Sequence, residues 1–313
     1  MRKSGRIIHA VQSRWKMRTR IRPSAVCDLR FNMIAPLPPH SAAASPAKTL
    51  CVCADDFAAS EPVTQAIVAL LAERRIQATS VMTCSPRWPE DAKRLSSVAD
   101  PTSVGLHLDW TSAFAVDAGH GMSLARLMGV CAIRALSHRH ARDVIHRQLD
   151  AFESVWQHPP AHVDGHQHVH QFAVIREALF EALTQRYGQA WPWLRNSLVA
   201  LPLQARWADR FKASIIQAWG ASPFARRVQF MGQRVKGPLL GVYDFDPAEG
   251  VFAHRMTQWM QTFDGLDSAV LMVHPAVADD PQDPIASARV REWQYLSGSQ
   301  WPELAARHGV SLG

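Results

Sequence analysis

The sequence predicts an α/β fold with a parallel β-sheet at its centre. From Thr49 to the end of the chain, short apolar segments alternate with longer amphipathic ones, and no internal repeat of short period is present. Strands that alternate with helices in this way usually belong to one parallel sheet. Such a sheet can close into a barrel or stay open and doubly wound, and the pattern alone allows both. In either form, ligands bind at the carboxyl ends of the strands.

The expected strands are short apolar segments, and polar residues end several of them. Thr49 to Ala54 is typical of a buried strand and runs directly into Asp55-Asp56-Phe57. His107 lies in the third strand, and His274 closes the last one. The other strands are expected at Ala78 to Thr83, Val104 to Trp110, His162 to His170, Trp191 to Asn196, Leu239 to Phe245 and Ala269 to His274.

The expected helices show apolar residues at helical spacing between recognisable start and stop signals. Ser60 and Pro62 suit the first turn of one helix. Pro159-Pro160 would end a long helix, and Gly188 suits the C-terminal stop of another. Residues 111–137 are less regular and indicate an inserted helix or a flap. The later helices are expected at His140 to Gln157, Val174 to Tyr187, Gln204 to Trp219, Val251 to Phe263, Arg289 to Leu296 and Pro302 to His308.

Bulky apolar residues line one side of the helix expected over Gln204 to Trp219. Trp207, Phe211, Ile215 and Trp219 are spaced four residues apart and fall roughly in line. Such a stripe more often packs into the core than forms a binding platform, so we predict that these side chains are buried.

A histidine-rich segment is the most distinctive motif of the sequence. His162, Asp164, His166, His168 and His170 occupy every second position within nine residues, in a chain with 15 histidines. In an extended strand, alternate side chains share a face, so all five would project together. A row of imidazoles with one carboxylate is the usual composition of a divalent-metal site. A polar loop with unrelated histidines is the alternative, and the density of the cluster argues against it.

Acidic or imidazole side chains recur at the ends of four expected strands. Asp55-Asp56, His107, His166 and His274 supply them. Each has a structural explanation alone, because an Asp after a strand often caps a helix and a His before Pro often lies in a turn. Their recurrence at strand ends favours one shared site.

Composition places the basic charge in the first part of the chain. The 313 residues include 47% apolar and 19% charged residues, which indicates a globular body. Nine of the 34 Lys and Arg but only one of the 27 Asp and Glu lie in residues 1–47, which leaves 25 basic and 26 acidic residues for the rest. We therefore expect no nucleic-acid binding by residues 48–313, a single domain.

Residues 1–47 are expected to form a flexible, Pro/Ala/Ser-rich N-terminal extension. The basic part of this extension could contact nucleic acid or acidic lipid, or translation could begin later, for example at Met33. It lacks the apolar region of a secretory signal, and no apolar run is long enough to span a membrane. The five cysteines show no paired zinc spacing, which favours a reducing, cytoplasmic setting.

The motifs together resemble those of the YdjC-like carbohydrate deacetylases, the ChbG/HpnK family. The resemblance covers residues 49–313 in order, and the doubled Asp with the His-rich motif is highly specific. The chain departs from the family pattern at Ala58, Gly165 and Ala173, where Gly, Ser and Pro are usual. The matching segments are Ala54-Asp55-Asp56-Phe57, Gly105-Leu106-His107-Leu108, His162-Val163-Asp164-Gly165-His166-Gln167-His168-Val169-His170 and His274-Pro275-Ala276.

This resemblance implies a distorted (β/α) barrel and a metal-dependent hydrolase that removes acetyl from an N-acetylated sugar. The family's metal ligands carry over onto Asp56, His107 and His166, its catalytic base onto Asp55, and a proton-donating histidine onto His274. One divalent ion is expected, Mg²⁺ or Zn²⁺ first, with Mn²⁺ or Co²⁺ as alternatives. The substrate would be a chitin-type oligosaccharide or an N-acetylglucosaminyl lipid, such as a hopanoid precursor.

Four further polar residues are candidates for supporting roles. Asp164 could orient an imidazole, and His168 and His170 could support the ligands or bind substrate. Arg195 could tune a carboxylate or hold substrate, or it could form a surface salt bridge. Two other functions remain open, namely hydrolysis of a phosphoester or cyclic amide on the same barrel and non-catalytic carbohydrate binding. The presence of both Asp55 and His274 favours catalysis, and a homodimer is possible.

Overall fold

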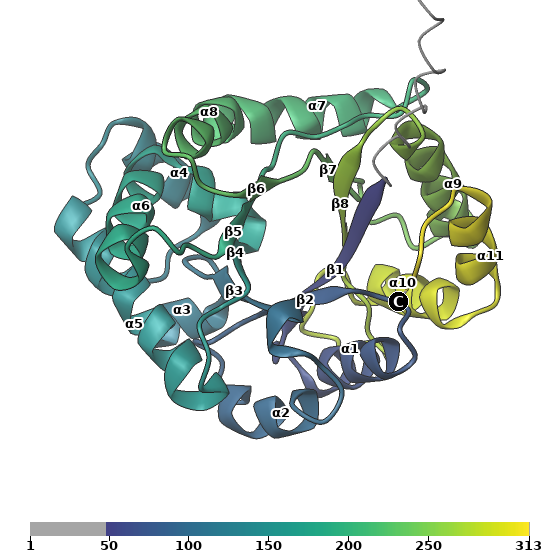
Figure 1. Ribbon diagram of the computed structural model, residues 1–313, viewed down its shortest axis with the longest axis horizontal. Helices are drawn as coiled ribbons and strands as arrows, with labels where there is room; N and C mark the ends of the chain where they lie inside the picture. Colours follow the sequence, from purple (N-terminus) through teal and green to yellow (C-terminus); the bar gives the residue numbers. More distant parts are fainter. Residues whose placement is uncertain (1–47, 313) are drawn as a thin grey trace, which may run out of the picture. The chain divides into compact units, whose positions relative to one another are not determined.

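The computed structural model describes residues 48–312. Eight strands form a single sheet in the order β6-β5-β4-β3-β2-β1-β8-β7, and every pairing is parallel. The sheet curls around the centre with the helices outside it (Figure 1). This curled half-barrel confirms the predicted distorted (β/α) barrel. The extension predicted over residues 1–47 lies outside the described residues.

The longest pairing in the sheet joins β1 to β8 over six residues. Next to β8, at the edge of the sheet, a single parallel bridge joins Val199 to Leu239 of β7. The strands are β1 (Thr49–Phe57), β2 (Ala78–Val81), β3 (Val104–Leu108), β4 (His162–Gly165), β5 (Trp193–Arg195), β6 (Val235–Lys236), β7 (Leu239–Leu240) and β8 (Ser268–Val273).

Each helix predicted over a stated range is present, with ends that differ by no more than three residues. The Ser137 hydroxyl accepts a hydrogen bond from the His140 N–H at the start of α5, and Gly188 follows α6 with a positive φ. None of the described helices is both long and apolar enough to cross a bilayer. The helices are α1 (Glu61–Ala72), α2 (Trp88–Leu95), α3 (Ala113–Asp117), α4 (Leu124–Ala132), α5 (His138–Trp156), α6 (Ala173–Tyr187), α7 (Trp207–Ile216), α8 (Ser222–Phe230), α9 (Val251–Phe263), α10 (Ala286–Ser297) and α11 (Gln300–Arg307).

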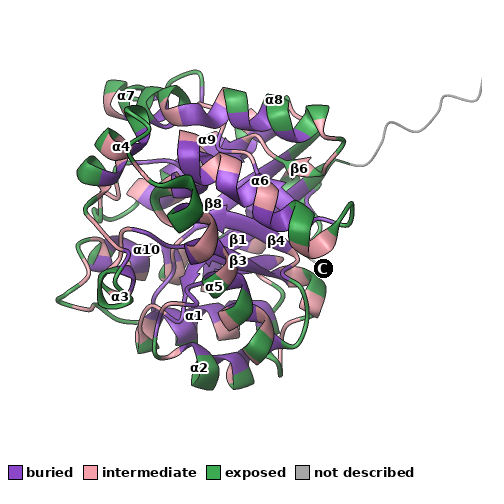
Figure 2. Cartoon of the chain, turned by 90° about the vertical axis from the view of Figure 1, so that its left-hand side faces the viewer, coloured by how far each residue is buried: buried purple, intermediate pink, exposed green. Residues whose placement is uncertain are grey.

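The core lies on both faces of the sheet, so the strands are almost wholly buried (Figure 2). Every residue of β1 except Thr49 is buried, as expected for a parallel strand covered on both faces. On the outer side of the sheet, Trp88 of α2 stacks on Phe152 of α5 with ring centroids 5.9 Å apart. Each fully buried side chain of this size contributes about 1.5–3 kcal/mol, so packing holds the strand ends rigidly in place.

A backbone irregularity in β1 places both carboxylates of the doubled Asp at the same end of the sheet. The pairing of β1 with β2 shifts register between Ala54 and Phe57, and Asp56 has a left-handed φ of 67°. In a regular strand, Asp55 and Asp56 would point to opposite faces. A bulge that inserts a left-handed residue re-aims the next side chain, and Asp tolerates this conformation better than most residues.

The prediction that the whole histidine-rich segment is one extended strand is wrong. β4 ends at Gly165, and His166–Gln171 forms a 3₁₀ segment, η2. Within it, Gln167 and His168 have positive φ values of 52° and 61°. The chain therefore turns over the end of the sheet, and the five side chains do not share one face.

The helix predicted over Gln204 to Trp219 is shorter, and the prediction that its apolar stripe is buried is wrong for three residues. α7 covers Trp207–Ile216, and an irregular π-type turn, Gln217–Ala221, follows because Gly220 has a φ of 121°. Trp207, Phe211 and Ile215 are exposed, whereas Trp219 is half-buried.

Candidate active site

A cleft of about 570 Å³ opens at the carboxyl ends of the strands. Its floor carries polar side chains from the strand ends, and its walls are mostly apolar. The wall residues come from the segments after β3, β4 and β7 and from α4 and α7. The floor includes Asp55, Asp56, His107, His166, His274 and Arg289, and the walls include Phe114, Leu124, Phe172, Ile215, Trp219 and Phe245.

Three polar side chains from three strand ends converge on the floor of this cleft. Asp56 Oδ1 lies 3.1 Å from His166 Nδ1 and 3.4 Å from His107 Nε2. One ligand-type atom from each residue lies within 4.8 Å of the others. One carboxylate and two imidazoles at this spacing form a donor set that fits a divalent ion and leaves positions open for other ligands. The three residues expected to be ligands are thus brought together.

Asp164 orients one of these imidazoles. His107 Nδ1 donates to Asp164 Oδ1 at 2.7 Å, which turns Nε2 toward Asp56. Such a carboxylate–histidine pair fixes the ring and its tautomer in many metal sites. Burial disfavours the charged imidazole, but Asp164 and Asp55 raise the pKa of His107 to about 10. A metal ion that binds here would therefore displace a proton.

Arg195 holds two buried carboxylates together beneath the cleft. Its guanidinium donates to both oxygens of Asp55, at 2.6 and 2.7 Å, and its Nη2 lies 2.5 Å from Asp164 Oδ2. All three side chains are buried, so Arg195 is not a surface salt-bridge residue. Burial works against the charged form of Asp164, but Arg195 and His107 hold its pKa below the usual range. Arg195 does not line the cleft, which supports a tuning role over substrate contact.

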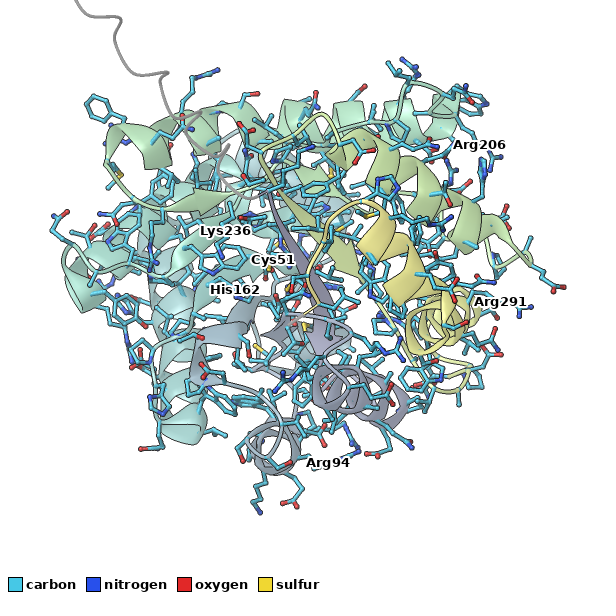
Figure 3. All side chains as sticks on the ribbon, turned by 45° about the vertical axis from the view of Figure 1, so that its right-hand side comes forward. Cys51, Arg94, His162, Arg206, Lys236 and Arg291 are labelled. Atoms are coloured by element: carbon cyan, nitrogen blue, oxygen red, sulfur yellow. The ribbon has the colours of Figure 1, made fainter. Side chains whose placement is uncertain are left out.

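Ser80 links this ion-pair network to His162. His162 is fully buried near the strands (Figure 3). The Ser80 hydroxyl donates to Asp164 Oδ2 at 2.6 Å and accepts from His162 Nε2 at 2.9 Å. His162 also stacks on Trp193 with centroids 4.3 Å apart. Cys53, His162 and Asp164 have ligand-type atoms close together, but the Ser80 hydroxyl lies between them within hydrogen-bond distance of all three. We therefore assign this cluster a structural role.

Gly105 is required because the His162 ring packs directly against it. A Cβ at this position would lie 2.3 Å from two ring atoms of His162. We expect Gly105→Ala to lower the free energy of unfolding by about 1–3 kcal/mol, because the stacked ring has little space to retreat. Denaturant titration measures this change. Gly129→Ala is the matched control, since nothing lies within 4 Å and α4 should gain up to about 1 kcal/mol. Equal stability of both variants would contradict the packing argument.

The other two histidines of the motif lie on different sides of the turn. His170 is buried, donates from Nε2 to the Arg195 carbonyl at 3.1 Å, and meets the edge of Phe224. It therefore supports the backbone of Arg195 rather than the cleft. His168 is half-buried and lines the cleft beside Lys212. Burial and nearby positive groups hold the pKa of His168 well below its usual range, so it is neutral.

Comparison with known proteins identifies the family. A family model described as YdjC-like protein matches residues 49–307. This chain belongs to the YdjC-like family. Chitooligosaccharide deacetylase from Serratia marcescens is 24% identical over 274 residues, covering 85% of this chain and 97% of that protein. A crystal structure from Enterococcus faecalis V583, of a proposed cellobiose-phosphate cleavage protein, has a TM-score of 0.60 and 19% identity, covering 85% and 97% of the two chains. The family resemblance is confirmed, and that structure shares the fold.

Two small-residue differences from the YdjC-like pattern lie beside the site. Ala58 has a φ of 70°, in the region where glycine, the usual family residue, has no Cβ strain. At Gly165, where the family usually has Ser, a Cβ would lie 3.0 Å from the His170 backbone nitrogen. In this YdjC-like protein, glycine therefore allows the η2 turn to pack closely against the end of β4.

Sequence reasoning missed two buried charged residues of α10. Arg289 donates to Asp56 Oδ2 at 2.7 Å and to Asp283 Oδ2 at 2.5 Å. Burial opposes the charged form of Asp56, but Arg289 and His166 hold its pKa well below the usual range. Glu292 accepts from Tyr243 Oη at 2.7 Å and lies beneath the last strand end. Arg289 and Glu292 share a helix face with the buried Leu296, and charged residues on such an inward face are uncommon. This spacing is the sequence feature that could have revealed them.

His274 lies at the edge of the cleft floor and contacts Glu292. Its backbone N–H donates to Glu292, and its Nδ1 is 4.0 Å from Glu292 Oε1. The ring meets the Phe245 ring edge to face at 5.2 Å. Burial lowers the pKa of His274 to about 4, although Asp56 and Asp55 oppose this change. Burial also raises the pKa of Glu292 to about 7.

Proposed function

We propose that this chain is a carbohydrate N-deacetylase that hydrolyses the acetamide of an N-acetylated sugar in the cleft. The observation that carries the proposal is the convergence of Asp56, His107 and His166 at the cleft floor, next to Asp55. This arrangement occurs in a member of the YdjC-like family, and the curated relative is a chitooligosaccharide deacetylase. Amide hydrolysis needs an activated water, a polarised carbonyl and a proton for the leaving amine.

In this proposal, Asp56, His107 and His166 hold one divalent ion. Such an ion lowers the pKa of a water and polarises the acetyl carbonyl. The two imidazoles favour Zn²⁺, whereas the carboxylate and open positions also suit Mg²⁺, Mn²⁺ or Co²⁺. Asp164 fixes the orientation of His107, and Arg289 neutralises the second oxygen of Asp56.

Asp55 is the proposed base and His274 the proposed acid. Asp55 lines the cleft beside the proposed ligands and accepts hydrogen bonds from Nη1 and Nη2 of Arg195. These two bonds fix the orientation of the Asp55 carboxylate. It would take the proton of the attacking water. His274 would protonate the departing amine. Glu292 accepts a hydrogen bond from the backbone N–H of His274 and so fixes the position of this residue at the cleft floor.

The substrate class proposed is a chitin-type oligosaccharide or an N-acetylglucosaminyl lipid. The curated relative supports the first, and the apolar cleft walls can accommodate either sugar rings or an apolar aglycone. We further propose a reducing, cytoplasmic setting, since the four cysteines among residues 48–312 form no disulfide.

Turnover of N-acetylated sugars should depend on a divalent metal. We expect the purified chain to release acetate from N-acetylglucosamine oligomers, to lose this activity on dialysis against a chelator, and to regain it with one of Zn²⁺, Mg²⁺, Mn²⁺ or Co²⁺. Acetate release and free amine are measured together. Activity on phosphoesters or cyclic amides, with none on acetamides, would instead favour a hydrolase of another bond. Sugar binding without turnover by the metal-loaded chain would indicate a binding protein.

A further inference from the structure

Helix α7 presents an apolar stripe to solvent. Trp207 is 81% exposed, Phe211 62% and Ile215 38%, and the three follow one another at four-residue spacing. Leu203, just before the helix, is 97% exposed. The opposite face is buried, with Asp209 paired to Arg255 at 2.7 Å, so the stripe faces outward because the helix is anchored in this orientation. Large exposed apolar groups in a row indicate an interaction surface.

The segment around this stripe is also the most basic part of the described chain. Residues 201–240 contain seven Lys and Arg and one acidic residue, Asp209. The rest of residues 48–313 contains 18 basic and 25 acidic residues. Arg210 lies on the exposed side of α7, and Arg226 and Arg227 are exposed on α8 beside Phe230. Helices α7 and α8 run along the same side of the molecule (Figures 1 and 2).

The stripe leads into the proposed catalytic cleft. Ile215 belongs to both, and Lys212, Ile216 and Trp219 of the same segment line the cleft wall. Exposure falls from Trp207 to Ile215 as the helix approaches the cleft. A surface that holds α7 would therefore lie next to the cleft entrance.

We propose that the α7 face, defined by Leu203, Trp207, Phe211 and Ile215 with Arg210, Arg226 and Arg227, docks on an anionic lipid bilayer. A tryptophan and a phenylalanine flanked by arginines are typical of a helix that lies in the membrane interface, with its rings among the acyl chains and its cations at lipid phosphates. The N-terminal extension, with nine basic residues and one acidic residue, is a poor cover for a basic face. A second copy would likewise bring two basic faces together.

Vesicle co-sedimentation of the full chain tests this proposal. We expect binding to vesicles of phosphatidylcholine with about 30% phosphatidylglycerol, weak binding to phosphatidylcholine alone, and weaker binding at high salt. Trp207→Ser/Phe211→Ser should reduce the partition coefficient at least ~10-fold, and Arg226→Glu/Arg227→Glu should reduce it on the anionic vesicles only. Val116→Ser, another exposed apolar residue, and Lys93→Glu, an exposed cation on α2, are the matched controls and should bind like wild type.

The outcomes separate this proposal from its alternatives and from the proposed enzyme activity. The proposal is overturned if the wild-type chain does not bind anionic vesicles. It is also overturned if the α7 variants bind them as well as wild type, because another part of the chain is then responsible. A dimer by light scattering that becomes a monomer in the α7 double variant would assign the face to a second copy instead. Hydrolysis of a soluble N-acetylglucosamine oligomer by the variants reports on the cleft independently, because none of the changed residues lies on its floor.

Discussion

Asp55→Asn should abolish turnover on an N-acetylated sugar while leaving the metal content of the purified protein near one ion per chain. The amide cannot accept the water's proton, and loss of a positioned base costs on the order of 10²–10⁴-fold in rate. The variant should still fold, because the amide oxygen can accept a hydrogen bond from Arg195 and Asp164 remains as its counter-charge. Metal analysis and acetate release, measured on the same preparation, give both quantities.

Asp56→Asn should instead lower metal occupancy, because a charged ligand is replaced by a neutral one. Asn tolerates the left-handed φ of 67° at this position, so the backbone change is small. Asp91→Asn, at a buried carboxylate of α2 paired with Thr64 and Arg87, is the matched control for a buried Asp outside the cleft. If Asp55→Asn empties the site while Asp56→Asn keeps ion and activity, the two roles are reversed. Normal hydrolysis by both variants would refute the assignment.

The elements of the fold could be predicted where local pattern and tertiary packing agree. α9 covers the predicted Val251–Phe263, and α6 begins one residue before the predicted start. In both helices, inward apolar residues recur at helical spacing. Because parallel strands expose their carboxyl ends at one edge, Asp55, His107 and His274 could also be placed near each other from sequence.

Other features depend on contacts that no local pattern contains. Histidines at every second position in the histidine-rich segment suggested a strand. The chain instead turns at Gln167 and His168, where φ is positive, and the alternation of residue types does not predict such a turn. Arg289 reaches Asp56 from 233 residues away. From sequence alone, a charged residue such as Arg289 is normally assigned to the solvent-exposed side of its helix. The exposed Trp207 was wrongly predicted to be buried. The spacing of apolar residues predicts that they share one face of the helix, but it does not predict whether another element packs on that face.

Arg195→Met should strongly lower the free energy of unfolding, because it leaves two buried carboxylates without their shared cation. Breaking a buried ion pair by removing one partner costs about 3–5 kcal/mol. Asp164 keeps Ser80 and His107, but Asp55 loses both of its guanidinium hydrogen bonds. Denaturant titration gives the free energy of unfolding, and acetate release below the unfolding transition gives the rate. We expect both to fall, because Asp55 is then no longer held in direction.

Arg255→Met separates the two effects. Arg255 is buried and pairs with Asp209 at 2.7 Å, but neither residue lines the cleft. Its replacement should also destabilise the chain by about 3–5 kcal/mol, but turnover per folded molecule should fall far less than in Arg195→Met, because Asp55 keeps both of its guanidinium hydrogen bonds. Arg195→Lys should recover part of the stability but little of the rate, because an ammonium group supplies charge without the bidentate geometry that fixes the Asp55 carboxylate. If Arg195→Met retains wild-type turnover per folded molecule, Asp55 needs no partner to act, and Arg195 serves the fold alone.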